Sequence, residues 1–188
     1  MRKQTAIVAC VTAFLGFHSL SAAALETQET YGIGRPPTAD EVKAWDITVM
    51  PDGTGLPPGS GTISRGAAVY REKCASCHGS TASEGPFETL VGTESLADQI
   101  KKGKRPNRTI GNMWFSAPVL FDYIRRAMPF NDPGSLTTED VYGLTGWLLY
   151  RNGLIKDDRA VDARILSGVK MPAFQIFVED PRRPWLVR

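Results

Sequence analysis

The amino-acid sequence predicts an all-α fold with an extended N-terminal arm and a C-terminal tail. Three stretches between residues 62 and 153 repeat apolar residues three and four positions apart, which places them on one helix face. Each stretch is bounded by a helix start or stop signal. The flanking segments, residues 25–61 and 154–188, are rich in proline, glycine or charge instead. The length is that of one domain of ordinary size.

The arm, residues 25–61, contains one short helix signal. Thr38 stands three positions before Glu41, which is the spacing of a capping box. Three apolar residues favour packing of the arm on the domain over disorder. They are Trp45, Ile47 and Val49.

Three helices are expected in the central segment. They run from about Ile63 to Cys74, from about Ser116 to Ala127, and from the capping residue Thr137 to the helix stop Asn152-Gly153. Inside the third helix, Gly143 and Gly146 should each cost about 1 kcal/mol relative to alanine. We therefore expect close backbone approach to another helix, with Gly66 in the first helix as the partner. The alternative is that these glycines are merely tolerated.

The tail, residues 154–188, is charged and has turn signals at Met171-Pro172 and Pro181–Pro184. We expect its apolar residues to dock on the core. They are Phe174, Ile176, Phe177 and Trp185.

Residues 1–24 have the three parts of a secretory signal peptide. Arg2 and Lys3 are the positive start, Ala6–Phe17 is the apolar region, and Ser21–Ala24 supplies small residues for cleavage. The apolar region is too short to span a bilayer, and no later apolar run is long enough either. The sequence predicts export to the periplasm. A retained anchor, or a lipoprotein acylated at Cys10, are the alternatives.

Removal of the signal peptide also changes the charge. Lys and Arg fall from 22 to 20 when Arg2 and Lys3 are lost, which equals the 20 Asp and Glu. The mature chain is then formally neutral, and it lacks the basic footprint of a nucleic-acid-binding protein.

The most informative stretch is Cys74-Ala75-Ser76-Cys77-His78. Two cysteines three apart, followed directly by histidine, are the attachment signature of c-type haem. On a helical turn both thiols project from one face and can reach the two vinyl groups of one porphyrin, while His78 meets the iron from the same side. The motif occurs once, so one covalently attached haem c is expected.

Other uses of the two cysteines fit less well. A structural zinc site needs four Cys or His ligands, but Cys10 and His18 lie in the signal peptide and only Cys74, Cys77 and His78 remain. A thioredoxin-like dithiol would need a βαβ context, whereas the residues before Cys74 have the pattern of a helix.

The second axial ligand of the iron is expected to be a methionine, because no other histidine remains. A thioether raises the reduction potential compared with a second histidine. In class I cytochromes c this methionine lies in a loop before the last core helix, which favours Met128. Met113, Met171, or a water molecule at an open site remain alternatives.

Several further stretches together resemble the c-type cytochrome subunits of bacterial sulfite and sulfane dehydrogenases. They are Gly32–Pro36, Ala44–Ile47, Pro51–Gly61, Leu120–Phe130 and Val169–Pro172. The run Pro-Asp-Gly-Thr-Gly-Leu-Pro-Pro-Gly-Ser-Gly at 51–61 is the most specific of them.

The resemblance implies a class I cytochrome c fold in which Cys74 and Cys77 form the thioethers and His78 and Met128 are the axial ligands. It implies an electron-transfer subunit, not an enzyme on its own, that takes electrons from a molybdenum-cofactor subunit and passes them to a downstream cytochrome or oxidase. Sulfane dehydrogenase cytochromes commonly carry two haems, so the single motif favours the single-haem sulfite dehydrogenase type.

Two other functions remain open. The chain could be a free cytochrome that serves another dehydrogenase or an oxidase, or a haem enzyme or sensor with an open iron site. A basic cluster could steer docking to an acidic partner or be a solvated loop. It consists of Lys101, Lys102, Lys104, Arg105 and Arg108.

Overall fold

A computed structural model describes residues 32–156 and 159–178. The chain divides into two units, residues 1–38 and 39–188. The first unit contains no helix or strand within its described residues, 32–38. The expected signal peptide, residues 1–24, lies outside the described residues, and so does Trp185 of the tail.

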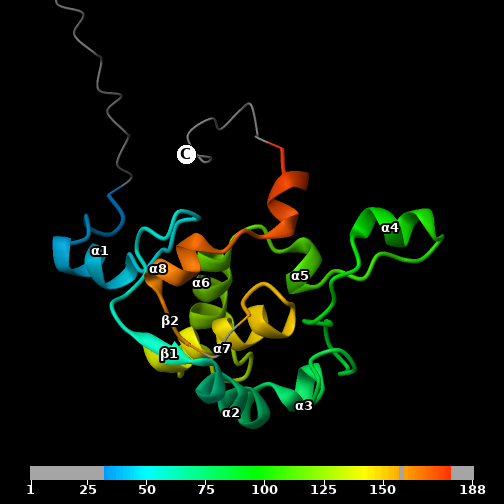
Figure 1. Ribbon diagram of the computed structural model, residues 1–188. Coiled ribbons are helices and arrows are strands. Elements are labelled where there is room, and N and C mark those ends of the chain that lie inside the picture. The colour runs from blue at the N-terminus through cyan, green and yellow to red at the C-terminus, as the bar shows by residue number, and fades with distance from the viewer. Residues whose placement is uncertain (1–31, 157–158, 179–188) are drawn as a thin grey trace, which may run out of the picture. The chain divides into compact units, whose positions relative to one another are not determined.

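The second unit is mostly helical, as the sequence predicts (Figure 1). In chain order its elements are α1 (Ala39–Trp45), β1 (Ser60–Thr62), α2 (Ile63–Lys73), α3 (Ala75–His78), α4 (Leu96–Lys101), α5 (Ile110–Met113), α6 (Ala117–Ala127), α7 (Thr138–Arg151), β2 (Ala160–Asp162), α8 (Ala163–Gly168) and the 3-10 helix η1 (Pro172–Ile176).

The three expected helices are confirmed as α2, α6 and α7. The Thr62 side chain accepts a hydrogen bond from the Arg65 amide and starts α2. Thr137 and Asp140 form a reciprocal capping box at the start of α7. The short helix signalled by Thr38 and Glu41 is confirmed as α1, and the helical turn expected at Cys74–His78 is confirmed as α3. The two strands and the helices α4, α5, α8 and η1 were not expected, because elements of three to six residues are too short to show a period.

The backbones of α2 and α7 touch where they cross. A Cβ atom on Gly66 would lie 1.9 Å from the carbonyl oxygen of Gly143, and one on Gly143 would lie 2.9 Å from the amide nitrogen of Gly66. Neither position admits a side chain at this separation. The expected close approach of Gly66 and Gly143 is therefore confirmed.

Gly146 has a different partner from the one expected. A Cβ atom there would lie 2.6 Å from Cγ2 of Val161 in β2 and 3.5 Å from Cγ1 of Ile63 in α2. The strand β2 pairs antiparallel with β1, with Val161 opposite Gly61. Gly146 thus makes room for a side chain of the tail, which local sequence patterns could not reveal.

The arm packs on the domain, but through fewer residues than expected. Val49 is buried, and its amide donates to the Asp122 carboxylate at 3.3 Å. The Tyr142 hydroxyl donates to the carbonyl of Pro57 at 2.7 Å. Trp45, in contrast, is 85% exposed, so the expectation that it packs on the domain is wrong. It lies at the end of α1, which buries none of its residues.

The tail also docks on the core, mainly through residues other than those expected. Val161, Leu166, Met171 and Ala173 are buried. Of the expected docking residues, Phe174 and Ile176 are 59% and 58% exposed, so that expectation is wrong for them. Phe177 is 49% exposed, and its ring lies 5.1 Å from that of Phe115, measured between centroids. The strand β2 and the helix α8 lie against the core, and they bury Val161 and Leu166 there.

The loop after α3 is organised around Glu84. Its carboxylate accepts hydrogen bonds from the Ser80 hydroxyl (2.9 Å), from the amide and hydroxyl of Thr81, and from the Ser83 amide (3.1 Å). These bonds, with the Thr81 hydroxyl foremost, lower the pKa of Glu84 from 4.5 to about 2. The ionised carboxylate therefore stabilises the turn by accepting these hydrogen bonds.

No helix in the described part of the chain is both long enough and apolar enough to cross a membrane.

The helix crossing predicts that Gly66→Ala strongly destabilises the protein. The added methyl group meets backbone atoms that cannot rotate away, so we expect a loss of about 3 kcal/mol in the free energy of unfolding. Denaturant unfolding measures it. Gly168→Ala is the control, because a Cβ atom there has nothing within 4 Å, and it should change stability by less than about 0.5 kcal/mol. Equal stability of the two variants would contradict the crossing.

The Glu84 turn predicts a pH effect. Because the folded-state pKa is below the unfolded value, the stabilisation is fully present above pH 4.5 and is lost as the pH falls toward 2. Glu84→Gln should be less stable than the wild type at neutral pH, and this difference should shrink between pH 4.5 and 2. Glu88→Gln, in the same loop, is the control, since its side chain makes no hydrogen bond in the described residues. A difference that stays constant with pH would refute the role of Glu84.

Candidate functional site

Cys74, Cys77 and His78 lie on one tight turn at the end of α2. Cys74 ends α2 with its amide donating to the Tyr70 carbonyl at 2.9 Å, and it also begins α3. The amides of Cys77 and His78 both donate to the Cys74 carbonyl, at 3.1 and 3.0 Å. The expected helical turn is therefore present, and Cys74, Cys77 and His78 share it.

Both cysteines are free thiols of intermediate exposure. Cys74 packs against the hydrophobic core. Burial raises the pKa of the Cys74 thiol to about 11, and the neighbouring Cys77 adds to the rise. The thiol of Cys74 therefore faces apolar surroundings, which suits attachment to a hydrophobic ring.

The imidazole of His78 is oriented by one backbone carbonyl. Its Nδ1 lies 2.9 Å from the oxygen of Glu88. A carbonyl can only accept, so Nδ1 must carry a hydrogen, and in the neutral imidazole Nε2 is then the nitrogen with the lone pair. A hydrogen bond of this kind fixes the ring and strengthens the other nitrogen as a metal ligand.

The position of the Glu88 carbonyl depends on the loop around it. The Phe87 amide donates to the Cys77 carbonyl at 3.1 Å, and a Cβ atom on Gly85 would lie 2.2 Å from the same oxygen. Further on, the side-chain amide of Asn152, at the end of α7, binds the carbonyl of Leu90 and the amide of Gly92. The loop is thus held against the motif at one end and against α7 at the other.

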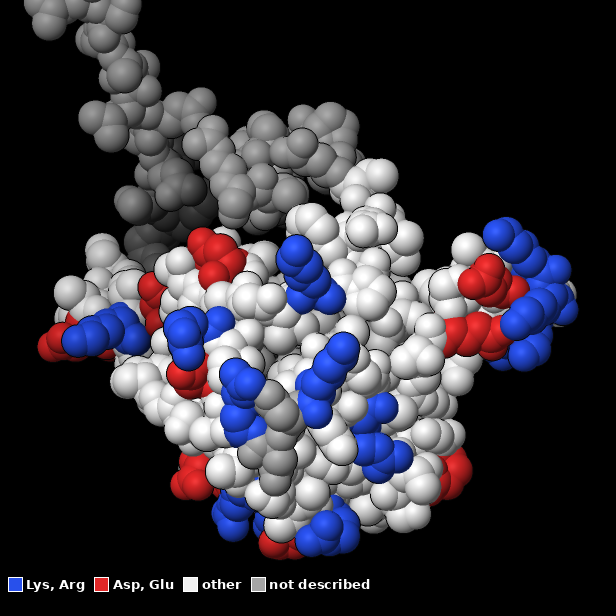
Figure 2. Space-filling model, in the orientation of Figure 1, with Lys and Arg blue, Asp and Glu red and all other residues white. Residues whose placement is uncertain are grey.

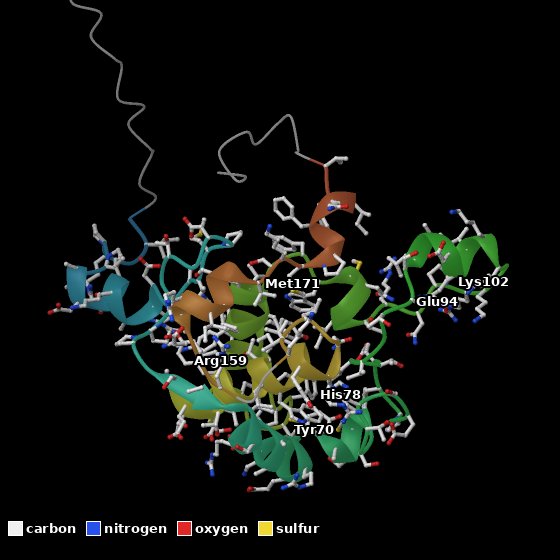
Figure 3. The ribbon with its side chains drawn as sticks, in the orientation of Figure 1. Tyr70, His78, Glu94, Lys102, Arg159 and Met171 are labelled. Carbon is white, nitrogen blue, oxygen red and sulfur yellow. The ribbon has the colours of Figure 1, made fainter. Side chains whose placement is uncertain are left out.

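Tyr70 connects the turn to α7. Its ring lies 4.2 Å from that of Trp147 in α7, measured between centroids, and its hydroxyl donates to the Gly79 carbonyl at 2.8 Å. Burial raises the pKa of Tyr70, so its hydroxyl stays protonated and donates at physiological pH. Figure 3 shows Tyr70 and His78 close together at this end of the molecule.

The methionines occupy different places. Met128 ends α6 and packs half-buried against the same core as Cys74. Met113 ends α5 and is also half-buried. Met171 is buried and caps η1, and it lies apart from His78 in Figure 3.

Trp114 carries a donor without a protein partner. Its Nε1 is the one buried side-chain nitrogen or oxygen in the described residues that makes no hydrogen bond. The ring packs on the core and lies 5.3 Å from the Tyr123 ring. An unsatisfied buried donor is costly, so it indicates an acceptor supplied by another group.

These residues fit a haem. Half-buried apolar residues, Cys74, Leu90, Trp114 and Met128 among them, line one core and suit a flat hydrophobic ring. A haem propionate is an acceptor of the kind that Trp114 Nε1 lacks. No group of three or more His, Cys, Asp or Glu in the described residues could hold a metal ion by itself.

The sequence predicted that Cys74, Cys77 and His78 share one turn, as they do in the structure, but gave no sign of the contacts of Glu88, Asn152 and Trp114. Glu88 contacts His78 through its backbone carbonyl, and every residue type has one, so the sequence gives no signal for it. Asn152 was assigned only as a helix stop. The cluster Ser80–Glu84 does carry a signal, since hydroxyl residues around one carboxylate typically form a turn.

Comparisons with known proteins agree with this site. Residues 61–148 match the family described as cytochrome c oxidase, cbb3-type, subunit III. No curated protein matches the chain in sequence. The structure is similar to a chain in the crystal structure of the sulfane dehydrogenase SoxCD from Paracoccus pantotrophus. The TM-score is 0.70 and the identity 40%, over 81% of this chain and 74% of that one.

The matched region includes the whole turn from Cys74 to His78 and the helices α2, α6 and most of α7. A cytochrome c domain transfers electrons through a covalently bound haem c, which is the group that the turn, the core and Trp114 fit. The mostly helical architecture is that of a class I cytochrome c. The chain therefore belongs to the family of c-type cytochrome subunits of sulfur dehydrogenases.

Proposed function

We propose that this protein is a periplasmic, single-haem electron-transfer subunit. It takes electrons from a molybdenum-cofactor subunit that oxidises sulfite or a sulfane, and it passes them to a downstream cytochrome or oxidase. The observation that carries the partner assignment is the 40% identity to a chain of a sulfane dehydrogenase over most of both chains. Residues 1–24 act as the export signal, followed by the arm (25–61), the cytochrome domain (62–153) and the tail (154–188).

In this proposal Cys74 and Cys77 form the thioethers, and His78 and Met128 are the axial ligands. When bound, the haem supplies a one-electron couple between ferric and ferrous iron. His78 is suited to ligation because Nδ1 is engaged by the Glu88 carbonyl at 2.9 Å and Nε2 is left for the metal. The bond also prevents ring rotation, so little rearrangement accompanies a change in iron charge.

Met128 is the better-supported sulfur ligand. It lies in the connection between α6 and α7, where its backbone is held by a hydrogen bond from its amide to the Ile124 carbonyl. It is half-buried against the core that Cys74 contacts. Met171 is buried elsewhere, at the start of η1. A thioether at this position stabilises ferrous iron and raises the potential.

The chain has no need of proton transfer or a nucleophile for this task. Tyr70 and Trp147, which pack under the motif, are buried and keep water away from the interior side of the site. A water-poor environment further favours the iron state of lower charge.

Met128→Ala tests the axial pair. We expect the variant to lose the weak near-infrared sulfur-to-iron absorption of the oxidised protein and to have a lower reduction potential. Met113→Ala and Met171→Ala are matched controls and should keep the band. Persistence of the band in Met128→Ala, with its loss in either control, would assign the ligand to that other methionine.

The proposed partner is tested by reduction kinetics. Sulfite alone should leave the purified oxidised protein unreduced, and reduction should follow when a molybdenum-cofactor sulfite dehydrogenase subunit is added. If the haem is reduced equally fast by an unrelated dehydrogenase, the protein is a general carrier. Copurification with the molybdenum subunit from the native organism is the corresponding test of a stable complex.

Carbon monoxide tests the open-site alternative. A six-coordinate haem should not bind carbon monoxide in its reduced state, whereas an open haem enzyme or sensor should bind it readily. Met128→Ala is the positive control, because removal of the sixth ligand opens the iron. Binding by the wild type would contradict the electron-transfer function.

A further inference from the structure

The segment 94–108 forms a basic lobe set apart from the other helices. In Figure 1 it projects at the right of the view and carries α4. It contains five Lys or Arg and two Asp or Glu, so its net charge is five minus two, or +3. Lys101 through Arg108 are all exposed, and Figure 2 shows their positive charges gathered on this lobe.

The base of the lobe is rigid. The Gln99 side chain is buried, and its amide donates to the carbonyls of Glu94 (3.0 Å) and Asn107 (3.2 Å) while accepting from the Asn107 amide (2.6 Å). The Asn112 side chain binds the same two carbonyls, at 2.8 and 3.0 Å. A solvated, unstructured loop would not need these buried amides. The lobe therefore presents its charges in a fixed arrangement.

All three lysines of the lobe have partners within it. Lys102 and Lys104 lie 2.7 and 3.5 Å from the Glu94 carboxylate, and Lys101 lies 3.7 Å from Asp98. Figure 3 shows Glu94 and Lys102 side by side. Arg105 and Arg108, in contrast, make no ion pair or side-chain hydrogen bond with any described residue. Two exposed guanidinium groups are thus left for an external partner.

These two arginines are close to the haem site. Arg105 and Arg108 line an open pocket together with Glu88 and Thr89. The carbonyl of Glu88 is the group that orients His78. A partner that binds Arg105 and Arg108 is therefore brought next to the His78 side of the haem.

We propose that the basic lobe is the docking site for an acidic redox protein that accepts the electron. This inference rests on the proposed electron-transfer function. Guanidinium groups bind carboxylates in a bidentate manner, and a surface with a net charge of +3 suits brief encounters that are steered by charge. A permanent interface with the donor subunit would be larger and more apolar. In the docked pair one electron leaves ferrous iron, which becomes ferric, and reduces the acceptor by one electron.

The test uses oxidised plant plastocyanin, an acidic copper protein, as the acceptor probe. Stopped-flow absorption measures the second-order oxidation of the reduced full-length holoprotein at low and high ionic strength. Arg105→Gln/Arg108→Gln should react about fivefold more slowly at low ionic strength and like the wild type at high ionic strength. Lys43→Gln/Arg71→Gln is the matched control. It removes the same charge from exposed positions on α1 and α2 and should leave the rate nearly unchanged.

Four results would overturn the proposal. Equal slowing in both double variants would show an effect of net charge alone, and no slowing in either would show that the lobe plays no part. A changed haem spectrum or reduction potential in Arg105→Gln/Arg108→Gln would assign these residues to the haem propionates. Slower reduction by sulfite and the molybdenum subunit, with unchanged oxidation by plastocyanin, would place the donor at the lobe.

Failure of the proposed function gives a different signature. A wild-type haem that binds carbon monoxide and exchanges no electron with plastocyanin at any ionic strength would refute both proposals. Electron exchange without dependence on ionic strength would refute only the docking site.

Discussion

The backbones of α2 and α7 touch at Gly66 and Gly143, and the position of the haem site follows from this contact. Because α2 leads without a break into Cys74, the separation of α2 from α7 determines where the two thiols lie relative to the core. The Arg65 guanidinium, 2.7 Å from the Asp140 carboxylate, joins the same two helices at their rim. A side chain at either glycine would push the motif outward, since interiors are close-packed and leave no room to absorb it.

The helix α7 also positions the parts of the site that are not helical. Trp147 supports Tyr70 under the motif, and Asn152 at the end of α7 holds the loop whose Glu88 carbonyl orients His78. The orientation of His78 therefore depends on a backbone carbonyl in a loop that a buried side-chain amide holds in place. Substitution of the exposed side chains in the loop around Glu88 should therefore leave the orientation of His78 unchanged. A shift of the loop backbone should alter that orientation.

Charge and apolar surface are separated in this protein. The core around Cys74, Trp114 and Met128 is apolar and suits a hydrophobic ring, and the exposed carboxylate of Glu84 is satisfied locally by its own turn. The excess of positive charge on the lobe at 94–108 lies outside that core on a rigid base. The lobe is joined to the rest of the domain by the hydrogen bonds of the buried Asn112 side chain, and no ion pair in the described residues connects it to the core.

Local patterns in the sequence determined the three main helices, the helical turn that holds Cys74, Cys77 and His78, and the close approach of Gly66 and Gly143. Each depends on residues near one another in the chain or on a spacing that a helix imposes. Only the tertiary structure decided that Gly146 accommodates Val161, that Val49 and not Trp45 anchors the arm, and that Met171 anchors the tail while Phe174 stays exposed. It also decided that Glu88 orients His78 and that Arg105 and Arg108 come to lie beside Glu88. These facts depend on how distant segments pack and on backbone atoms that every residue shares, so residue type alone could not reveal them.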